Sequence, residues 1–165
     1  MTRTWGELLR NKGMIDKFYR ELPTLEQITL RSVHFDRYGP TIILRLDLPV
    51  FPDFPLPEWA EEGCDRLQFH LKFLAVEDVS MHQWKPPVTA DVTMTALERR
   101  RINVAVAGEG VNLTFTSSDS LTVDRISAFR APGTGPDREK HLYAGKVDSM
   151  RFSELPAVDR KSYYE

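Results

Sequence analysis

Apolar residues recur at every second position in several stretches of the chain. The alternation runs through residues 42–48 and returns over residues 67–73, 88–94, 102–106 and 111–115. Because successive side chains of a β-strand point to opposite faces, each stretch predicts a strand with one buried and one solvated face. We expect Gln68, His70 and Lys72 on such a solvated face. A chain of this kind builds a sheet surface, and binding is its first expected role.

The N-terminal residues follow a different pattern, with apolar side chains three and four positions apart. This pattern starts at Trp5, continues to Leu22 and stops before Pro23, while Gly13 interrupts it. Such spacing places the apolar side chains along one stripe of a helix, and glycine and proline mark helix ends. One or two short helices, packed on one face of the sheet, are therefore predicted.

Short turns join the predicted strands, which favours an antiparallel arrangement of sequential neighbours. The predicted fold class is α+β: a curled antiparallel meander of six to seven strands with the short N-terminal helices. A change of register is expected near Arg31 and Ser32, because the apolar phase shifts there. The strands are predicted at residues 26–35, 42–48, 66–76, 88–96, 102–107, 111–116 and 121–129.

Length and proline content suggest how the chain is divided. The 165 residues suit one domain, placed at residues 1–130. Residues 131–136 read Ala-Pro-Gly-Thr-Gly-Pro, which is typical of a linker. Residues 131–165 are therefore interpreted as a linker and a C-terminal tail, with one added edge strand as an option.

Charge and cysteine content narrow the range of partners. The net charge of −2 offers no basic surface for nucleic acid, so no nucleic-acid partner is expected. The single cysteine excludes an internal disulfide and a cysteine-built zinc site. No apolar stretch approaches the roughly 20 residues of a membrane helix, and the N-terminus is too polar for a signal peptide. The expectation is a cytoplasmic protein without a membrane partner.

Residues able to carry catalysis are scattered along the sequence. His34, His70, His82 and His141 fall on different predicted elements and show no metal-binding spacing, so no metal and no cofactor are expected. Cys64 stands among acids that raise the pKa of a thiol rather than activate it. The chain is therefore predicted not to be an enzyme, although two carboxylates meeting from distant strands stay open as an alternative.

The segment of residues 51–65 is the strongest candidate site. It combines prolines, large rings and five acids without a single base. A stiff loop with an aromatic anchor and surrounding carboxylates suits a basic protein surface. The opposite interpretation, in which the rings pack against the sheet and the acids only solvate the loop, stays open. The candidate contact residues are Asp53, Glu58, Trp59, Glu61, Glu62 and Asp65.

The order of these motifs resembles a family of bacterial immunity proteins, Immunity protein 50. The resemblance covers about residues 4–129 and includes the opening with Trp5, a strand that closes on Asp36-Arg37-Tyr38-Gly39-Pro40, and the later Phe51-Pro52, Trp59, Gly63-Cys64-Asp65 and Trp84. It implies a small α+β protein encoded beside a polymorphic toxin, which it binds inside the producing cell. No catalytic or toxin-contact residue can be transferred from the resemblance.

Two functional hypotheses follow. The first is neutralisation of a cognate toxin domain by stoichiometric protein–protein binding; for a nuclease toxin, the acidic loop would cover a basic groove. The alternative is a β-rich domain that binds a small ligand of unknown identity, which requires an interior pocket larger than side chains can fill. The sequence does not predict an oligomeric state.

Overall fold

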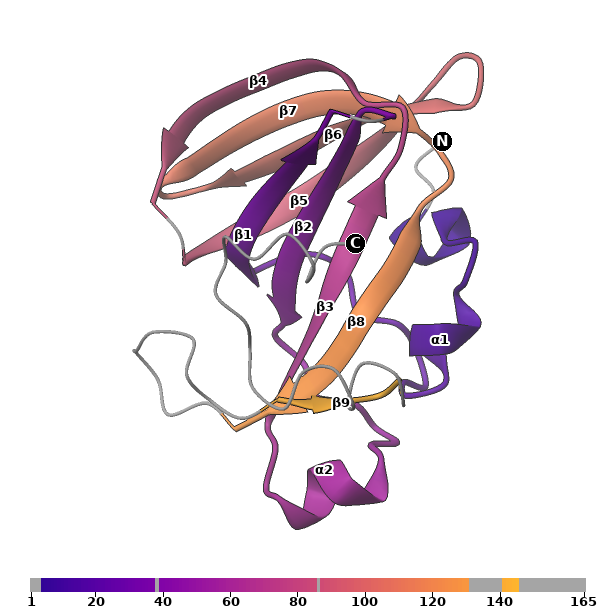
Figure 1. The fold of residues 1–165 in the computed structure, drawn as a ribbon, viewed down its shortest axis with the longest axis vertical. Coiled ribbons are helices and arrows are strands. Elements are labelled where there is room, and N and C mark those ends of the chain that lie inside the picture. The colour runs from indigo at the N-terminus through magenta and orange to yellow at the C-terminus, as the bar shows by residue number, and fades with distance from the viewer. Residues whose placement is uncertain (1–3, 38, 86, 131–140, 146–165) are drawn as a thin grey trace.

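The computed structural model describes residues 4–37, 39–85, 87–130 and 141–145. Its helical elements are short: the 3-10 turn η1 (Trp5–Leu8) and the helices α1 (Gly13–Asp16) and α2 (Pro57–Glu61). Nine strands are present in the described residues: β1 (Ile28–Asp36), β2 (Thr41–Leu48), β3 (Arg66–Phe73), β4 (Glu77–Trp84), β5 (Val88–Leu97), β6 (Arg101–Gly108), β7 (Val111–Ser118), β8 (Thr122–Phe129) and β9 (Leu142–Tyr143). They form one antiparallel sheet in the order β4-β7-β6-β5-β1-β2-β3-β8-β9 (Figure 1).

The alternating segments of the sequence become strands, as predicted. The register of β1 against β2 shifts between Leu30 and Ser32, where the apolar phase changes in the sequence. The predicted count of six to seven strands is wrong, because β4 is a separate strand and β9 adds a short one at the opposite edge. The expected linker at residues 131–136 lies outside the described residues, and the division into two parts stays a prediction.

Strand order departs from the predicted meander. Two antiparallel series, β1-β2-β3 and β5-β6-β7, are joined through the pairing of β1 with β5, and the chain passes from β3 to the far edge as β4. The end of β3 lies close to the other series, because Ser118 N donates to Leu74 O at 2.9 Å and Arg101 Nη2 donates to Ala75 O at 2.8 Å. The crossing from β3 to β4 is therefore short.

The sheet is curled but not closed into a barrel. The rings of Phe73 on β3 and Phe115 on β7 meet edge to face with centroids 5.0 Å apart, although β6, β5, β1 and β2 lie between their strands in the sheet. The two halves of the inner face therefore turn toward each other.

Apolar side chains fill this hollow. Trp5 of η1 stacks on Phe69 of β3 at 5.6 Å, and Ile15 of α1 is fully buried, so the short helical elements cover part of the inner face as predicted. The fully buried residues also include Phe73 and Phe115. A small ligand would need this space, and the packing of the described residues gives the ligand-binding hypothesis no support.

Much of the outer face of β2 and β3 is also buried, which corrects the expectation of a solvated face for Gln68 and His70, whereas Lys72 is only partly buried. All eight residues of β2 are buried, including Arg45 and Asp47, and so are Gln68 and His70 on β3. Alternation of residues shows which face of a strand is polar and which is apolar. It does not show whether another segment of the chain packs over the polar face and buries it.

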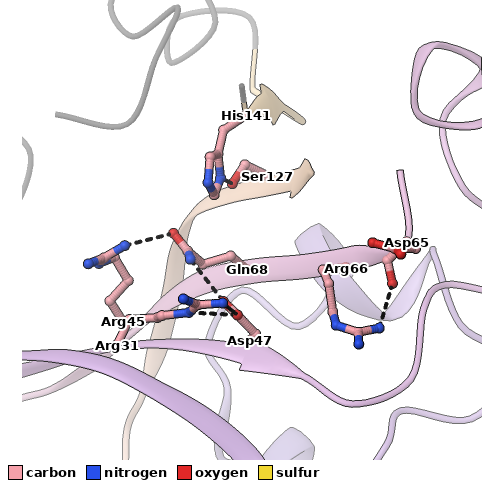
Figure 2. Close-up of polar contacts among 8 residues, drawn as sticks. All are labelled: Arg31, Arg45, Asp47, Asp65, Arg66, Gln68, Ser127 and His141. Carbon is pink, nitrogen blue, oxygen red and sulfur yellow. Dashed lines mark hydrogen bonds and ion pairs between the residues drawn. The ribbon is translucent and has the colours of Figure 1, made fainter. Parts of the chain in front are cut away.

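We define the outer polar layer as the polar side chains of this face, and hydrogen bonds connect several of them; the layer comprises Arg31, Ser32, Arg45, Asp47, Gln68, His70, Arg125, Ser127 and His141. Figure 2 shows Asp47 accepting from Arg31 Nε and from Gln68 Nε2, each at 2.8 Å. Arg45 donates to Ser32 Oγ at 3.2 Å and to Gln68 Oε1 at 3.4 Å. These bonds offset the cost of burying charged groups, which is large when such groups lack partners.

Candidate functional site

The predicted site, residues 51–65, forms a distinct projection beyond one end of the sheet, where α2 stands apart from the strands (Figure 1). We call residues 51–65 the acidic projection. Local sequence explains its shape: Leu56 is extended before α2, Pro57 occupies the first turn, and Gly63 follows the helix at a φ of 69°. Proline is favoured in a first turn because its N–H is not needed there, and a left-handed residue after a helix suits glycine.

Trp59 holds the projection to the body of the protein. Its side chain is 0% exposed, its ring packs at 4.9 Å against Phe18, and its Nε1 donates to Leu142 O at 2.9 Å. One side chain thus joins α2 to the N-terminal region and to β9. Trp59 was predicted as a surface anchor for the partner; instead the structure places it in the core, as the opposite interpretation expected.

Backbone hydrogen bonds fix both ends of the projection. At its start, Phe54 N donates to Phe18 O at 2.9 Å, and the Asp53 carboxylate accepts from Arg20 N at 3.0 Å. At its end, Asp65 N donates to Phe129 O at 3.0 Å, next to the first residue of β3. These attachments preset the backbone of the projection, so less conformational entropy is lost when it meets a partner.

The remaining predicted site residues all face solvent. The structure brings them together on one projection: Asp53, Glu58, Glu61, Glu62 and Asp65 are exposed. One exposed ring accompanies them, because Phe54 is 51% exposed, and the Arg20 guanidinium lies 5.7 Å from its centroid. Phe54 was not among the predicted site residues. No sequence signal separates it from the less exposed rings, because Pro52, the proline that precedes it, also adjoins the partly buried Phe51.

The acids of the projection affect two neighbouring titratable groups. Burial raises the pKa of the Cys64 thiol, and the charges of Glu62 and Asp65 raise it further. Burial also raises the pKa of the Tyr19 hydroxyl, and Asp53 adds to the effect. A thiol with a raised pKa is a poor nucleophile at neutral pH, which agrees with the sequence-based expectation for Cys64.

Basic groups lie at the margins of the projection. Arg20 is next to Asp53 and Phe54, and Arg66 follows Asp65, whose carbonyl oxygen accepts from Arg66 Nη1 at 3.3 Å (Figure 2). The tip of the projection, with Glu58, Glu61 and Glu62, carries carboxylates alone. Chemically this arrangement offers negative charge and one apolar ring, which suits contact with a basic surface that also has an apolar pocket.

The part of the chain that the structure describes contains no group of three or more His, Cys, Asp or Glu residues arranged to hold a metal ion. Within the same residues, no helix has the length and apolar character required to cross a membrane.

Comparison with known proteins gives one finding. No curated protein and no solved structure matches the chain. A family model described as Immunity protein 50 matches residues 11–129, which is well over half of the sequence and includes the acidic projection. The match starts after Trp5 and ends with β8, so it covers the sheet from β1 to β8. The chain belongs to the Immunity protein 50 family.

Proposed function

We propose that this protein neutralises a cognate bacterial toxin by binding it stoichiometrically in the cytoplasm of the cell that makes both. Membership of the Immunity protein 50 family is the observation that carries the proposal. The protein acts by covering a surface of the toxin, and catalysis has no part in it.

The acidic projection is the proposed contact surface. Its backbone is held by the hydrogen bonds of Asp53, Phe54 and Asp65 and by the buried Trp59, so it meets the toxin in a preset shape. The exposed Phe54 ring supplies apolar contact area, and the carboxylates attract a basic toxin surface. For a nuclease toxin, that basic surface is the groove that binds the nucleic-acid backbone.

Growth rescue tests the function itself. The C-terminal domain of the toxin encoded beside this protein is expressed in a naive cell with and without the chain. Restored growth and a co-purifying complex of fixed stoichiometry are expected. If growth stays arrested although the chain is folded and abundant, the proposed function is wrong, whichever surface makes the contact.

Charge reversal tests the contact surface separately. The triple variant Glu58→Lys, Glu61→Lys, Glu62→Lys should weaken toxin binding by about 100-fold, or roughly 3 kcal/mol, because attraction becomes repulsion. The matched control Glu26→Lys, Glu98→Lys, Glu109→Lys changes the net charge equally at exposed positions elsewhere and should bind normally. Equal affinities of the two variants would remove the projection from the contact.

A second pair of variants isolates the apolar contribution. Phe54→Ala should weaken the complex by about 2 kcal/mol, or about 30-fold, if the ring enters a pocket on the toxin. Phe35 is similarly exposed on β1, away from the projection, so Phe35→Ala is the control and should leave the affinity unchanged. Trp59 is unsuitable for this test because its loss would damage the fold.

A further inference from the structure

Strand β4 is the edge of the sheet farthest from the acidic projection (Figure 1). It pairs with β7 on one side, and all eight of its residues are exposed. Among them are three apolar side chains of considerable size: Val79 is 47% exposed, Met81 41% and Trp84 38%. Most soluble proteins protect an edge strand with charges or cover it, because its free backbone groups accept another strand.

Two of these apolar residues, Met81 and Trp84, continue the inner face of the sheet to its edge. Met81 is registered with Leu113 and Trp84 with Val111, and paired residues in adjacent strands share a face. Leu113 and Val111 are buried in the core. The core layer therefore ends at β4 in an exposed apolar strip, which another strand could cover.

Regular strand geometry on β4 is confined to a short window. The register against β7 shifts between Glu77 and Ser80 and again between His82 and Trp84, so the irregularities stand on either side of Met81. Bulges of this kind prevent indiscriminate pairing along an edge. A strand that adds to β4 must fit the short segment centred on Met81.

Opposite charges stand on the two sides of this window, with Glu77 and Asp78 before it and Lys85 after it. Glu77 lies four residues before Met81, and Lys85 lies four residues after it. When two copies of β4 pair antiparallel around Met81, Glu77 of each copy comes to the same end of the contact as Lys85 of the other, and the two Met81 side chains adjoin. The small net charge of −2 adds little repulsion between whole molecules.

We propose that the protein forms a two-fold symmetric dimer through antiparallel pairing of β4 with β4 of a second copy, with Met81 on the symmetry axis. The same patch on both copies makes the contact, as a two-fold interface requires. Each copy keeps its acidic projection at the opposite end of the molecule (Figure 1). The dimer thus leaves both projections accessible to partners.

Sedimentation of the full-length protein over a wide range of concentrations tests the dimer. The mass should rise to twice that of one chain in a reversible, concentration-dependent way. Met81→Lys places one lysine of each copy at the two-fold axis of the dimer. Because the two positive charges repel each other, the dissociation constant of the dimer should rise at least tenfold. Leu97→Lys alters an equally exposed apolar residue on β5 and should leave dimerisation unchanged. A monomer at every concentration, or a dimer insensitive to Met81→Lys, would overturn the proposal.

A charge swap tests the register. Lys85→Glu comes to the same end of the contact as Glu77 of the other copy and should weaken the dimer, whereas the double variant Glu77→Lys, Lys85→Glu restores opposite charges and should recover it. Glu77 also lies 3.7 Å from Arg101, but at the exposed surface this pair contributes little. Failure of the double variant to exceed Lys85→Glu in dimer affinity would contradict antiparallel pairing around Met81.

Covalent trapping provides an independent readout. In a Cys64→Ser background, Met81→Cys should form an intermolecular disulfide under mild oxidation, because residues on a two-fold axis between antiparallel strands come within disulfide range. Leu97→Cys in the same background should not. If β4 variants remain monomeric and instead lose toxin binding, the occupant of this edge is the toxin and the dimer proposal fails.

Discussion

Trp59 shows how burial decides the role of a residue type. Its ring is enclosed by the body of the protein, while Phe54, five residues earlier in the same projection, is half exposed. The segment around them has no periodic pattern, so nothing in the sequence separates a ring that anchors the projection from a ring that faces a partner. Contacts with Phe18 and Leu142, both distant in sequence, make the difference.

Trp59 is therefore expected to stabilise the fold. Trp59→Ala removes a fully buried ring and should lower the free energy of unfolding by about 3–5 kcal/mol. Trp59→Phe keeps an aromatic ring but leaves Leu142 O without its donor, so a smaller loss of about 1–3 kcal/mol is expected. Urea unfolding measures both. Phe54→Ala is the surface control, and a loss there as large as that of Trp59→Ala would contradict this assignment.

His70 connects protonation to stability. It is buried on the outer face of β3, and burial, followed by the charges of Arg45 on β2, Arg125 on β8 and His34 on β1, holds its pKa well below the usual range. The folded protein therefore keeps His70 neutral, whereas the unfolded chain binds a proton near pH 6.5. Because the unfolded state binds more protons, acid favours unfolding through this residue.

Above about pH 6.5, neutral His70 does not reduce the free energy of unfolding. As the pH falls from there toward the pKa of His70 in the folded protein, the free energy of unfolding should drop by up to about 1.4 kcal/mol per pH unit. Urea unfolding at a series of pH values from 7.5 to 5, which span the ordinary histidine pKa of about 6.5, measures the slope of the free energy of unfolding against pH. His70→Gln does not titrate and should show a shallower slope than the wild type. Parallel curves for wild type and His70→Gln would contradict a neutral buried His70.

At the level of elements, the strands were the most predictable part of the fold. The period of two in residues 42–48 and 111–115 reflects burial of one face, which is a local property of the sequence. β4 was less visible because two register shifts interrupt its pattern. Which strands become neighbours depends on the curvature of the whole sheet. Because the sheet curls, Leu74 after β3 lies beside Ser118 of β7, and the chain crosses there to the far edge. No local sequence pattern predicts this crossing.

Gly108 tests the close pairing of β5 and β6. A Cβ atom at this position would lie 2.2 Å from Thr89 O and 3.0 Å from Ala90 Cα, both backbone atoms. Gly108→Ala should therefore force the strands apart and cost at least about 1–3 kcal/mol in the free energy of unfolding.

Gly13 provides the matched control for the same substitution. A Cβ atom there meets nothing within 4 Å, and the residue lies at the start of α1. Gly13→Ala should be neutral or stabilising by up to about 1 kcal/mol, because alanine loses less backbone entropy on folding. Denaturant unfolding of both variants makes the comparison. Equal effects would show that the β5–β6 spacing tolerates a side chain.

For the whole molecule, the position of the charges influences encounter with a partner more than the net charge does. The chain carries a net charge of only −2, yet five carboxylates are gathered on the acidic projection. A local field of this kind accelerates encounter with an oppositely charged surface and is screened over about 8 Å at physiological salt. Under the proposed function, this field speeds the capture of newly made toxin.

Association with the cognate toxin should consequently slow as salt increases. Between low and high ionic strength, stopped-flow measurements should show the association rate constant falling on the order of 10-fold, with a smaller change in the dissociation rate. The variant Glu58→Lys, Glu61→Lys, Glu62→Lys should lose this dependence, whereas the control reversal at Glu26, Glu98 and Glu109 should retain it. An association rate that is independent of salt in the wild type would exclude electrostatic steering by the projection.

The sequence by itself determined the regularly alternating strands, the composition of the acidic segment and the resemblance to an immunity-protein family. These depend on residues close together in the chain or on the order of motifs along it. Only the tertiary structure decided which surfaces are covered: it buried Trp59, Asp47 and His70 and left Phe54 and the β4 strip exposed. The physical reason is that exposure is set by contacts between segments distant in sequence, such as that of Trp59 with Leu142, while alternation records only which side chains share a face.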